Sequence, residues 1–201
     1  MTDTAPSRLI VGLTGATGTI LGVRLLQALQ AAGVESHLVM TKWAIRTLVH
    51  ETDYSAEDVQ RLATCTYRAH DQGAAISSGS FLTRGMVVCP CSMRTLASIA
   101  HGVGDQLVHR AADVILKERR KLVLVVREAP LHDIHLENML KLSRMGVVIL
   151  PPVPAFYNRP RSVDDIVNHI VMRILDQFDI HVELRDRWEG IMATSSKLVQ
   201  S

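Results

Sequence analysis

The chain has 201 residues, 47% hydrophobic and 21% charged, the balance of a soluble globular protein with one sizeable core. Lysine and arginine (22) barely outnumber aspartate and glutamate (20), so we expect neither nucleic acid nor anionic membrane as a partner. Three cysteines, a polar N-terminus and the lack of an apolar run of about 18 residues favour a reducing, cytoplasmic location without a membrane span.

Strands and helices are predicted to alternate along the first half of the chain, because short apolar runs are followed by stretches with helical spacing. In chain order we expect a strand over 8–13, a glycine-rich turn over 14–18, a helix over 23–32, a strand over 37–40, and helices over 43–50 and 55–63.

The second half continues this alternation. We expect a strand over 86–90, helices over 92–100 and 111–120, a strand over 122–126, a helix over 136–142, a strand over 146–150, a proline-rich loop over 151–160 and a helix over 162–178. Buried apolar strands joined by helices predict an α/β fold, a Rossmann-like (flavodoxin-like) doubly wound parallel sheet. We expect a single domain over 1–201, with flexible tails at 1–7 and 193–201.

Ligands of such sheets bind at the carboxyl ends of the strands, where the glycine-rich turn 14–18 lies. Its glycines and the following helix N-terminus predict a phosphate site. The turn is also typical of short-chain dehydrogenases, which need an acidic residue after the second strand to hold the ribose and a tyrosine and lysine four residues apart for catalysis. Here Thr41 and Lys42 follow the second strand, and no tyrosine has a lysine four residues later. A mononucleotide is therefore the simpler ligand, and FMN is known at such switch points.

Seven sequence blocks carry a more specific signal. They are 14–18, 77–81, 90–95, 110–119, 127–131, 135–139 and 154–157. Together they resemble the UbiX-type flavin prenyltransferases, in particular the branch that accompanies phenolic acid decarboxylases, over nearly the whole chain.

This resemblance implies a metal-independent prenyltransferase that alkylates reduced FMN with dimethylallyl phosphate at N5 and C6. It also implies trimers that assemble into a homododecamer, with FMN at a junction between protomers. The prenylated FMN would pass to a separate UbiD-type decarboxylase of aromatic acids.

The resemblance also implies the site residues. Those that would hold FMN are Gly15, Ala16, Thr17, Thr41, Ser92, Met93, Arg94, Thr95 and Arg127. Those that would hold the prenyl phosphate are Lys117, Tyr157 and Arg173, three donors that suit a dianion. Those that would carry the chemistry are Glu128, Glu51 and Thr17.

The two carboxylates would relay the proton lost at C6. We expect Glu128 to be buried after its strand and rank it above Glu51, which is expected to be an exposed helix-end acid. Two positions depart from the pattern of the resemblance. Thr17 replaces a frequent serine but keeps the hydroxyl, and Gln72 lies near a position where some members place a pocket tryptophan.

Two other functions stay open at this point. An FMN-dependent cysteine decarboxylase shares the resemblance at 90–95, but the residue pattern on which those enzymes rely is not found here. A non-catalytic FMN-carrying component of a hydroxyaromatic acid decarboxylase complex would not need Lys117, Tyr157 and Arg173 together. We expect no metal site, because His132 and His135 have no further ligands converging in the sequence.

Overall fold

The computed structural model describes residues 7–185 and 187. The predicted tails therefore lie outside the described residues, apart from Ser7, whose carbonyl accepts from the Glu35 N–H at 2.8 Å. The elements are β1 (Arg8–Leu13), α1 (Thr19–Ala31), β2 (Glu35–Met40), α2 (Lys42–Glu51), α3 (Ala56–Leu62), β3 (Cys65–Tyr67), the 3₁₀ turn η1 (Ala75–Ser77), β4 (Gly85–Cys91), α4 (Met93–Ala100), α5 (Leu107–Lys117), β5 (Lys121–Val126), α6 (Asp133–Arg144), β6 (Val148–Ile149) and α7 (Val163–Asp176).

The six strands of the described residues form one parallel sheet in the order β3-β2-β1-β4-β5-β6. The five strands expected from the sequence, β2-β1-β4-β5-β6, take the flavodoxin-like order, and β3 adds an edge strand that completes the Rossmann order. The predicted fold class is confirmed. The chain reverses its direction of winding between β1 and β4, so this is the switch point where a ligand is expected.

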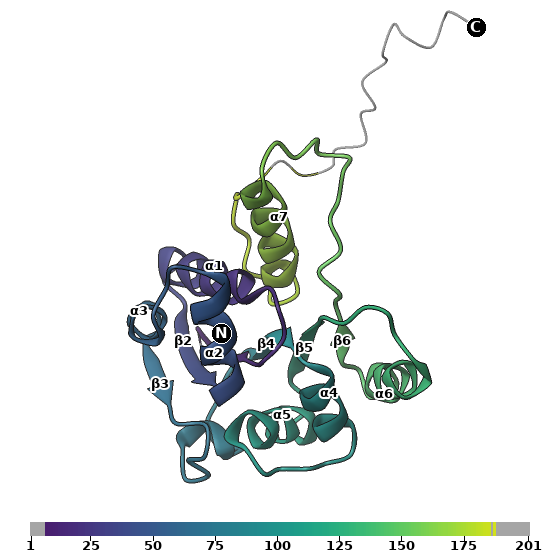
Figure 1. Cartoon of the computed structure of the whole chain (residues 1–201). Helices are drawn as coiled ribbons and strands as arrows, with labels where there is room; N and C mark the ends of the chain where they lie inside the picture. The colour runs from purple at the N-terminus through teal and green to yellow at the C-terminus, as the bar shows by residue number, and fades with distance from the viewer. Residues whose placement is uncertain (1–6, 186, 188–201) are drawn as a thin grey trace, which may run out of the picture.

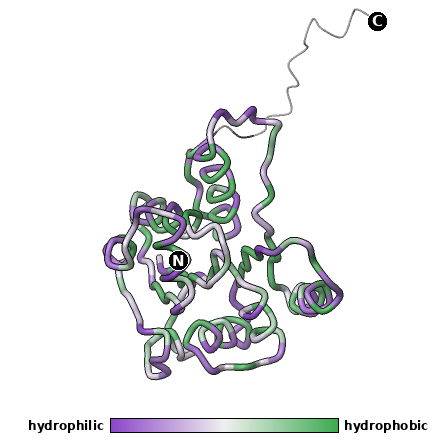
Figure 2. The backbone as a smooth tube through the Cα atoms, viewed as in Figure 1, coloured by the Kyte–Doolittle hydropathy of each residue, from purple (hydrophilic) through white to green (hydrophobic). Residues whose placement is uncertain are grey.

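Helices cover both faces of the sheet (Figure 1), because alternate strand residues point to opposite sides. On one face, Leu9 and Val11 of β1 pack with α1 and α7. On the other, Ile10 of β1 packs with α4 and α5. Figure 2 shows the matching pattern in the helices, where green and purple alternate along α5 and α7.

Several boundaries differ from the predicted ones, and the largest shifts are in α1 and α5. Helix α1 begins at Thr19, four residues before the expected start at Val23. Helix α5 begins at Leu107 and ends at Lys117, because Arg119 takes a positive φ of 54° that no helix continues. Strand β3 was not predicted.

Two further features lie away from the sheet core. Gln72 is exposed and donates from Nε2 to the Gly104 carbonyl at 3.2 Å. The segment between β6 and α7 runs away from the sheet (Figure 1) and exposes Val153 and Phe156. Within the described part of the chain, no helix combines the length and apolar character needed to cross a bilayer.

Candidate functional site

The loops after β1 and β4 are joined across the switch point by one hydroxyl. Thr14 Oγ1 donates to the Pro90 carbonyl at 2.8 Å and accepts from the Ser92 N–H at 2.8 Å. Thr14 is 1% exposed, so this pair of hydrogen bonds is protected from water. The first residues after the two strands are thereby held in a fixed relation.

Two helix N-termini border a cavity beside this bridge. Thr41 caps α2 by accepting from the Ala44 N–H at 3.1 Å, and Ser92 caps α4 by accepting from the Thr95 N–H at 3.3 Å. The positive ends of both helix dipoles favour an anion here. The cavity holds about 270 Å³ and is lined by Gly15, Thr41, Trp43, Ser92, Arg94, Thr95, Gln106 and His109.

Gly15 sets how closely the first loop approaches α2. A Cβ on this residue would lie well inside van der Waals distance of Trp43 Cβ and 3.4 Å from the Trp43 backbone. The Trp43 side chain is 59% exposed, with the Arg46 guanidinium 5.0 Å from its ring centroid. An exposed ring and clustered phosphate donors suit a nucleotide that carries an aromatic system.

The N-terminus of α1 already holds an anion supplied by the protein. Glu51, the last residue of α2, accepts through Oε2 from Gly18 N at 2.9 Å, Thr19 N at 3.0 Å and Thr19 Oγ1 at 2.9 Å. The N–H groups of Gly18 and Thr19 are therefore already paired with Glu51, and phosphate binding by the 14–18 turn stays a prediction. The starts of α2 and α4 offer further donors for a phosphate.

The environment of Glu51 keeps it ionised. Burial alone would raise its pKa, but hydrogen bonds from Thr17, Thr19 and Gly18 outweigh burial and hold the pKa below its ordinary value. Thr17 bonds this carboxylate with its hydroxyl, so two of the three predicted catalytic residues are in contact. Glu51 has the more constrained environment of the two carboxylates.

Glu128 does not have the burial that was expected. It is exposed, and its Oε1 accepts from the Ala129 N–H at 3.1 Å. The strand ends at Val126, so Glu128 already lies in the loop beyond the sheet. Glu51 is exposed at the end of α2, as expected, so the burial on which Glu128 was ranked above Glu51 is absent in a single chain.

A second cavity of about 280 Å³ lies on the other side of the 14–18 loop. Its lining residues are Thr17, Gly18, Ile20, Leu21, Arg127, Pro152, Val167 and Ile170. The predicted flavin residues are thus divided between two cavities. Gly15, Thr41 and Ser92 lie with Arg94 and Thr95 in the first, whereas Thr17 and Arg127 lie in the second; Ala16 is buried and Met93 half-buried beside them.

Only part of the predicted prenyl-phosphate set comes together in one chain. Tyr157 Oη lies 2.9 Å from His169 Nε2, and Arg173 follows one turn later on α7, paired with Asp176 at 3.2 Å. Burial, and then the Arg173 charge, lower the pKa of His169. Lys117 instead ends α5 four residues before β5 begins, at the amino edge of the sheet, where it pairs with Glu118.

The residues that the sequence did not indicate are Trp43, Gln106 and His109. His109 is buried and its Nδ1 lies 2.7 Å from Asp105 Oδ1. Trp43 directly follows the loop after β2, so an aromatic residue at a strand end was a usable signal. Gln106 and His109 begin α5 and gave no such signal.

Comparison with known proteins identifies the family of this chain. A model described as Flavoprotein matches residues 1–175. A protein of Bacillus subtilis (strain 168), named as a probable UbiX-like flavin prenyltransferase, is 63% identical over 184 residues, 92% of this chain and 90% of that protein.

Solved structures are similar over the same part of the chain. AnUbiX (PadA1) in complex with FMN and dimethylallyl pyrophosphate has a TM-score of 0.91 at 51% identity, covering 92% of this chain and 98% of that one. The dodecameric FMN-dependent UbiX-like decarboxylase of Escherichia coli O157:H7 has a TM-score of 0.88 at 62% identity, covering 92% and 100%. The chain belongs to the flavoprotein family and, within it, to the UbiX-type flavin prenyltransferases.

Proposed function

We propose that this protein transfers the dimethylallyl group of dimethylallyl phosphate to N5 of reduced FMN and joins it to C6. The product, prenylated FMN, would serve a separate UbiD-type decarboxylase of aromatic acids. The observation that carries the proposal is the ionised Glu51, which is held with Thr17 beside the second cavity. A carrier of FMN would need Glu51 only to cap the start of α1, whereas a transferase would also use its carboxylate as a proton acceptor.

The two cavities would hold different parts of FMN. The hydroxyls of Thr41 and Ser92, two helix N-termini and Arg94 fit a phosphate monoester. Thr17 and Arg127 in the second cavity would contact the ring. Helix α2 runs for 10 residues, from Lys42 to Glu51, so about 14 Å separates the phosphate donors from the catalytic carboxylate, a reach that an extended mononucleotide covers.

Reduced FMN supplies the nucleophilic nitrogen and ring carbon, and the residues of the second cavity would handle the protons. The Thr17 hydroxyl donates a hydrogen bond to Glu51. A proton released in the cavity would therefore have a path through this hydroxyl to the carboxylate. Arg127 supplies positive charge on the same side of the loop. Glu128 stays a proposed second carboxylate, placed in the exposed loop after Arg127.

The prenyl phosphate would be held by residues of more than one copy of the chain. Tyr157 and Arg173 lie on the outward-running segment and α7, whereas Lys117 ends α5, which packs on the opposite face of the sheet. Exposed apolar side chains on this segment and on α6, including Phe156 and Ile134, offer surface for association. Because the E. coli relative is dodecameric, we propose a dodecamer here.

The decisive experiment incubates the protein anaerobically with reduced FMN and dimethylallyl phosphate, with the pyrophosphate in a parallel reaction. We expect the extracted flavin to gain one C₅H₈ unit by mass spectrometry, with inorganic phosphate released. A flavin of unchanged mass in both reactions would reject the transferase in favour of an FMN carrier. The parallel reaction identifies the preferred donor.

Mixing of variant protomers tests the shared prenyl-phosphate site. Lys117→Ala and Arg173→Ala should each lose most activity, because the leaving phosphate loses a cation. If the two residues serve one site from different chains, co-expression of both variants leaves roughly a quarter of the sites with both cations. We therefore expect partial recovery in the prenylation assay. Activity no higher than that of the single variants would place both residues in the same chain's site.

A further inference from the structure

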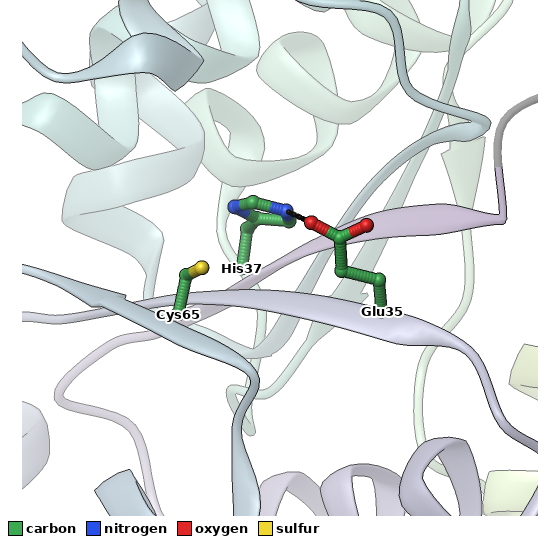
Figure 3. Close-up of side chains that lie close together, drawn as sticks. All are labelled: Glu35, His37 and Cys65. Carbon is green, nitrogen blue, oxygen red and sulfur yellow. Dashed lines mark hydrogen bonds and ion pairs between the residues drawn. The ribbon is translucent and has the colours of Figure 1, made fainter.

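A group of metal-ligating side chains lies at the opposite end of β2 from the flavin residues. Glu35, His37 and Cys65 bring a carboxylate, an imidazole and a thiol together (Figure 3). We propose that these three residues form a structural binding site for Zn²⁺. Glu35 begins β2 and Thr41 follows its end, so the site lies roughly 20 Å from the phosphate donors, judged by the rise of a strand.

Strand geometry explains why the three side chains meet. Glu35 and His37 are two residues apart on β2, so their side chains share one face of the sheet. Cys65 on β3 is the register partner of His37 in the parallel pair, so its side chain lies beside the imidazole on that face. The site therefore exists only once β3 pairs with β2.

The ligand atoms have nearly the spacing that zinc needs. The potential ligand atoms all lie within 4.8 Å of one another, and His37 Nε2 is 3.0 Å from Glu35 Oε1. Ligand atoms of a tetrahedral zinc ion lie roughly 3.3 to 3.6 Å apart, given metal distances of about 2.0 Å to nitrogen or oxygen and 2.3 Å to sulfur. Side-chain shifts of about 1 Å would then suffice for coordination.

The surrounding residues already orient two of the ligands. Tyr67 Oη lies 2.9 Å from His37 Nδ1, which leaves Nε2 directed at Glu35. Arg8 donates through Nε to the other carboxylate oxygen, Glu35 Oε2, at 2.9 Å. Outer hydrogen bonds of this kind fix the tautomer and orientation of metal ligands.

Charge and access also favour a divalent ion. The Arg8 hydrogen bond is the main reason that the pKa of Glu35 lies below its ordinary value, so the carboxylate is ionised. Zn²⁺ would bind Cys65 as the thiolate, so the Glu35 carboxylate and this thiolate would together balance the two positive charges of the ion. Binding would displace the proton of the thiol and that of His37 Nε2. His37 is 2% exposed, whereas Glu35 and Cys65 are half-buried, so an ion has a path in and water can complete the coordination.

The other cysteines do not compete for the metal. Cys89 and Cys91 are both fully buried, and burial raises the pKa of each thiol far above its ordinary value. A thiolate signal from the folded protein would therefore report on Cys65. Zinc would act by fastening the three-residue strand β3 to β2 and would take no part in the prenyl transfer.

The test uses the purified full chain, freed of metal with a chelator and titrated with Co²⁺, a coloured stand-in for Zn²⁺. We expect one equivalent to bind with a thiolate-to-cobalt charge-transfer band that Zn²⁺ abolishes. Cys65→Ser should lose the band and bind Zn²⁺ at least about tenfold more weakly, and Glu35→Gln should weaken binding while keeping the band. Glu57→Gln, which removes an exposed carboxylate of α3, is the matched control and should behave as wild type.

Thermal unfolding with and without Zn²⁺ provides a second readout. Zinc should raise the Tm of the wild type and the control but not that of Cys65→Ser, because binding stabilises only the folded site. Binding without the band, a band that survives in Cys65→Ser, or no saturable binding would each overturn the proposal. None of these measurements depends on flavin or prenyl transfer, so failure here leaves the proposed enzyme activity untouched.

Discussion

Glu51→Gln is expected to bind FMN as the wild type does and to form prenylated flavin about 10² to 10⁴ times more slowly. The glutamine oxygen can still accept from the Gly18 and Thr19 N–H groups, so the start of α1 keeps its shape. What is lost is the ionised oxygen that, in the proposed mechanism, takes the proton passed by Thr17. The measurement is anaerobic single-turnover prenylation followed by mass spectrometry, with FMN affinity determined separately.

The control for this substitution is Glu57→Gln, which removes a carboxylate from an exposed position and should leave the rate unchanged. A normal rate for Glu51→Gln would remove this residue from the mechanism. Loss of FMN binding instead would mean that the carboxylate serves mainly to build the loop.

The pH dependence of stability separates a catalytic role of Glu51 from a role in building the loop. The pKa of Glu51 is lowered from 4.5 in the folded protein, so its stabilising hydrogen bonds are fully present above that pH. They are lost as the pH falls through the lower folded-state pKa. Glu51→Gln lacks this contribution at every pH, so the Tm values of the variant and the wild type should converge in acid.

Gly15→Ala is expected to abolish FMN binding at concentrations that saturate the wild type. The new methyl group would overlap Trp43 Cβ, which is fixed to the helix backbone and cannot rotate away. Either the 14–18 loop or the start of α2 must then move, and both line the first cavity. Quenching of flavin fluorescence on titration with protein would measure the loss.

Gly104→Ala is the matched control, because a Cβ at that glycine meets nothing within 4 Å. It should bind FMN as the wild type does. Full binding by Gly15→Ala would show that the loop and α2 can separate without harm, and would remove the first cavity from the proposed flavin site.

The sheet was predictable because its central strands are long and apolar. All seven residues of β4 are buried, and such runs leave a strong signal. Strand β3 left none, since it has three residues, of which Thr66 is exposed and Cys65 and Tyr67 are half-buried. It forms by pairing with β2, a tertiary interaction that local sequence does not encode.

The site was predictable where its chemistry is local. Thr41 and Ser92 lie directly after apolar strands and cap the helices that follow, which sequence spacing can indicate. The contact of Glu51 with the start of α1 was not visible, because it spans 32 residues of chain, from Thr19 to Glu51. Adjacency to a strand suggested burial for Glu128, but one residue beyond Arg127 the chain has already left the sheet.

If protomers associate through the segment between β6 and α7, as proposed, the activity should depend on protein concentration. Val153 and Phe156, 70% and 71% exposed, leave apolar surface in water while a protomer is alone. Lys117 and Arg173 of that lone protomer also serve different sites under the proposed arrangement. Specific activity should therefore depend on protein concentration. It should fall when dilution dissociates the oligomer, although each protomer remains folded.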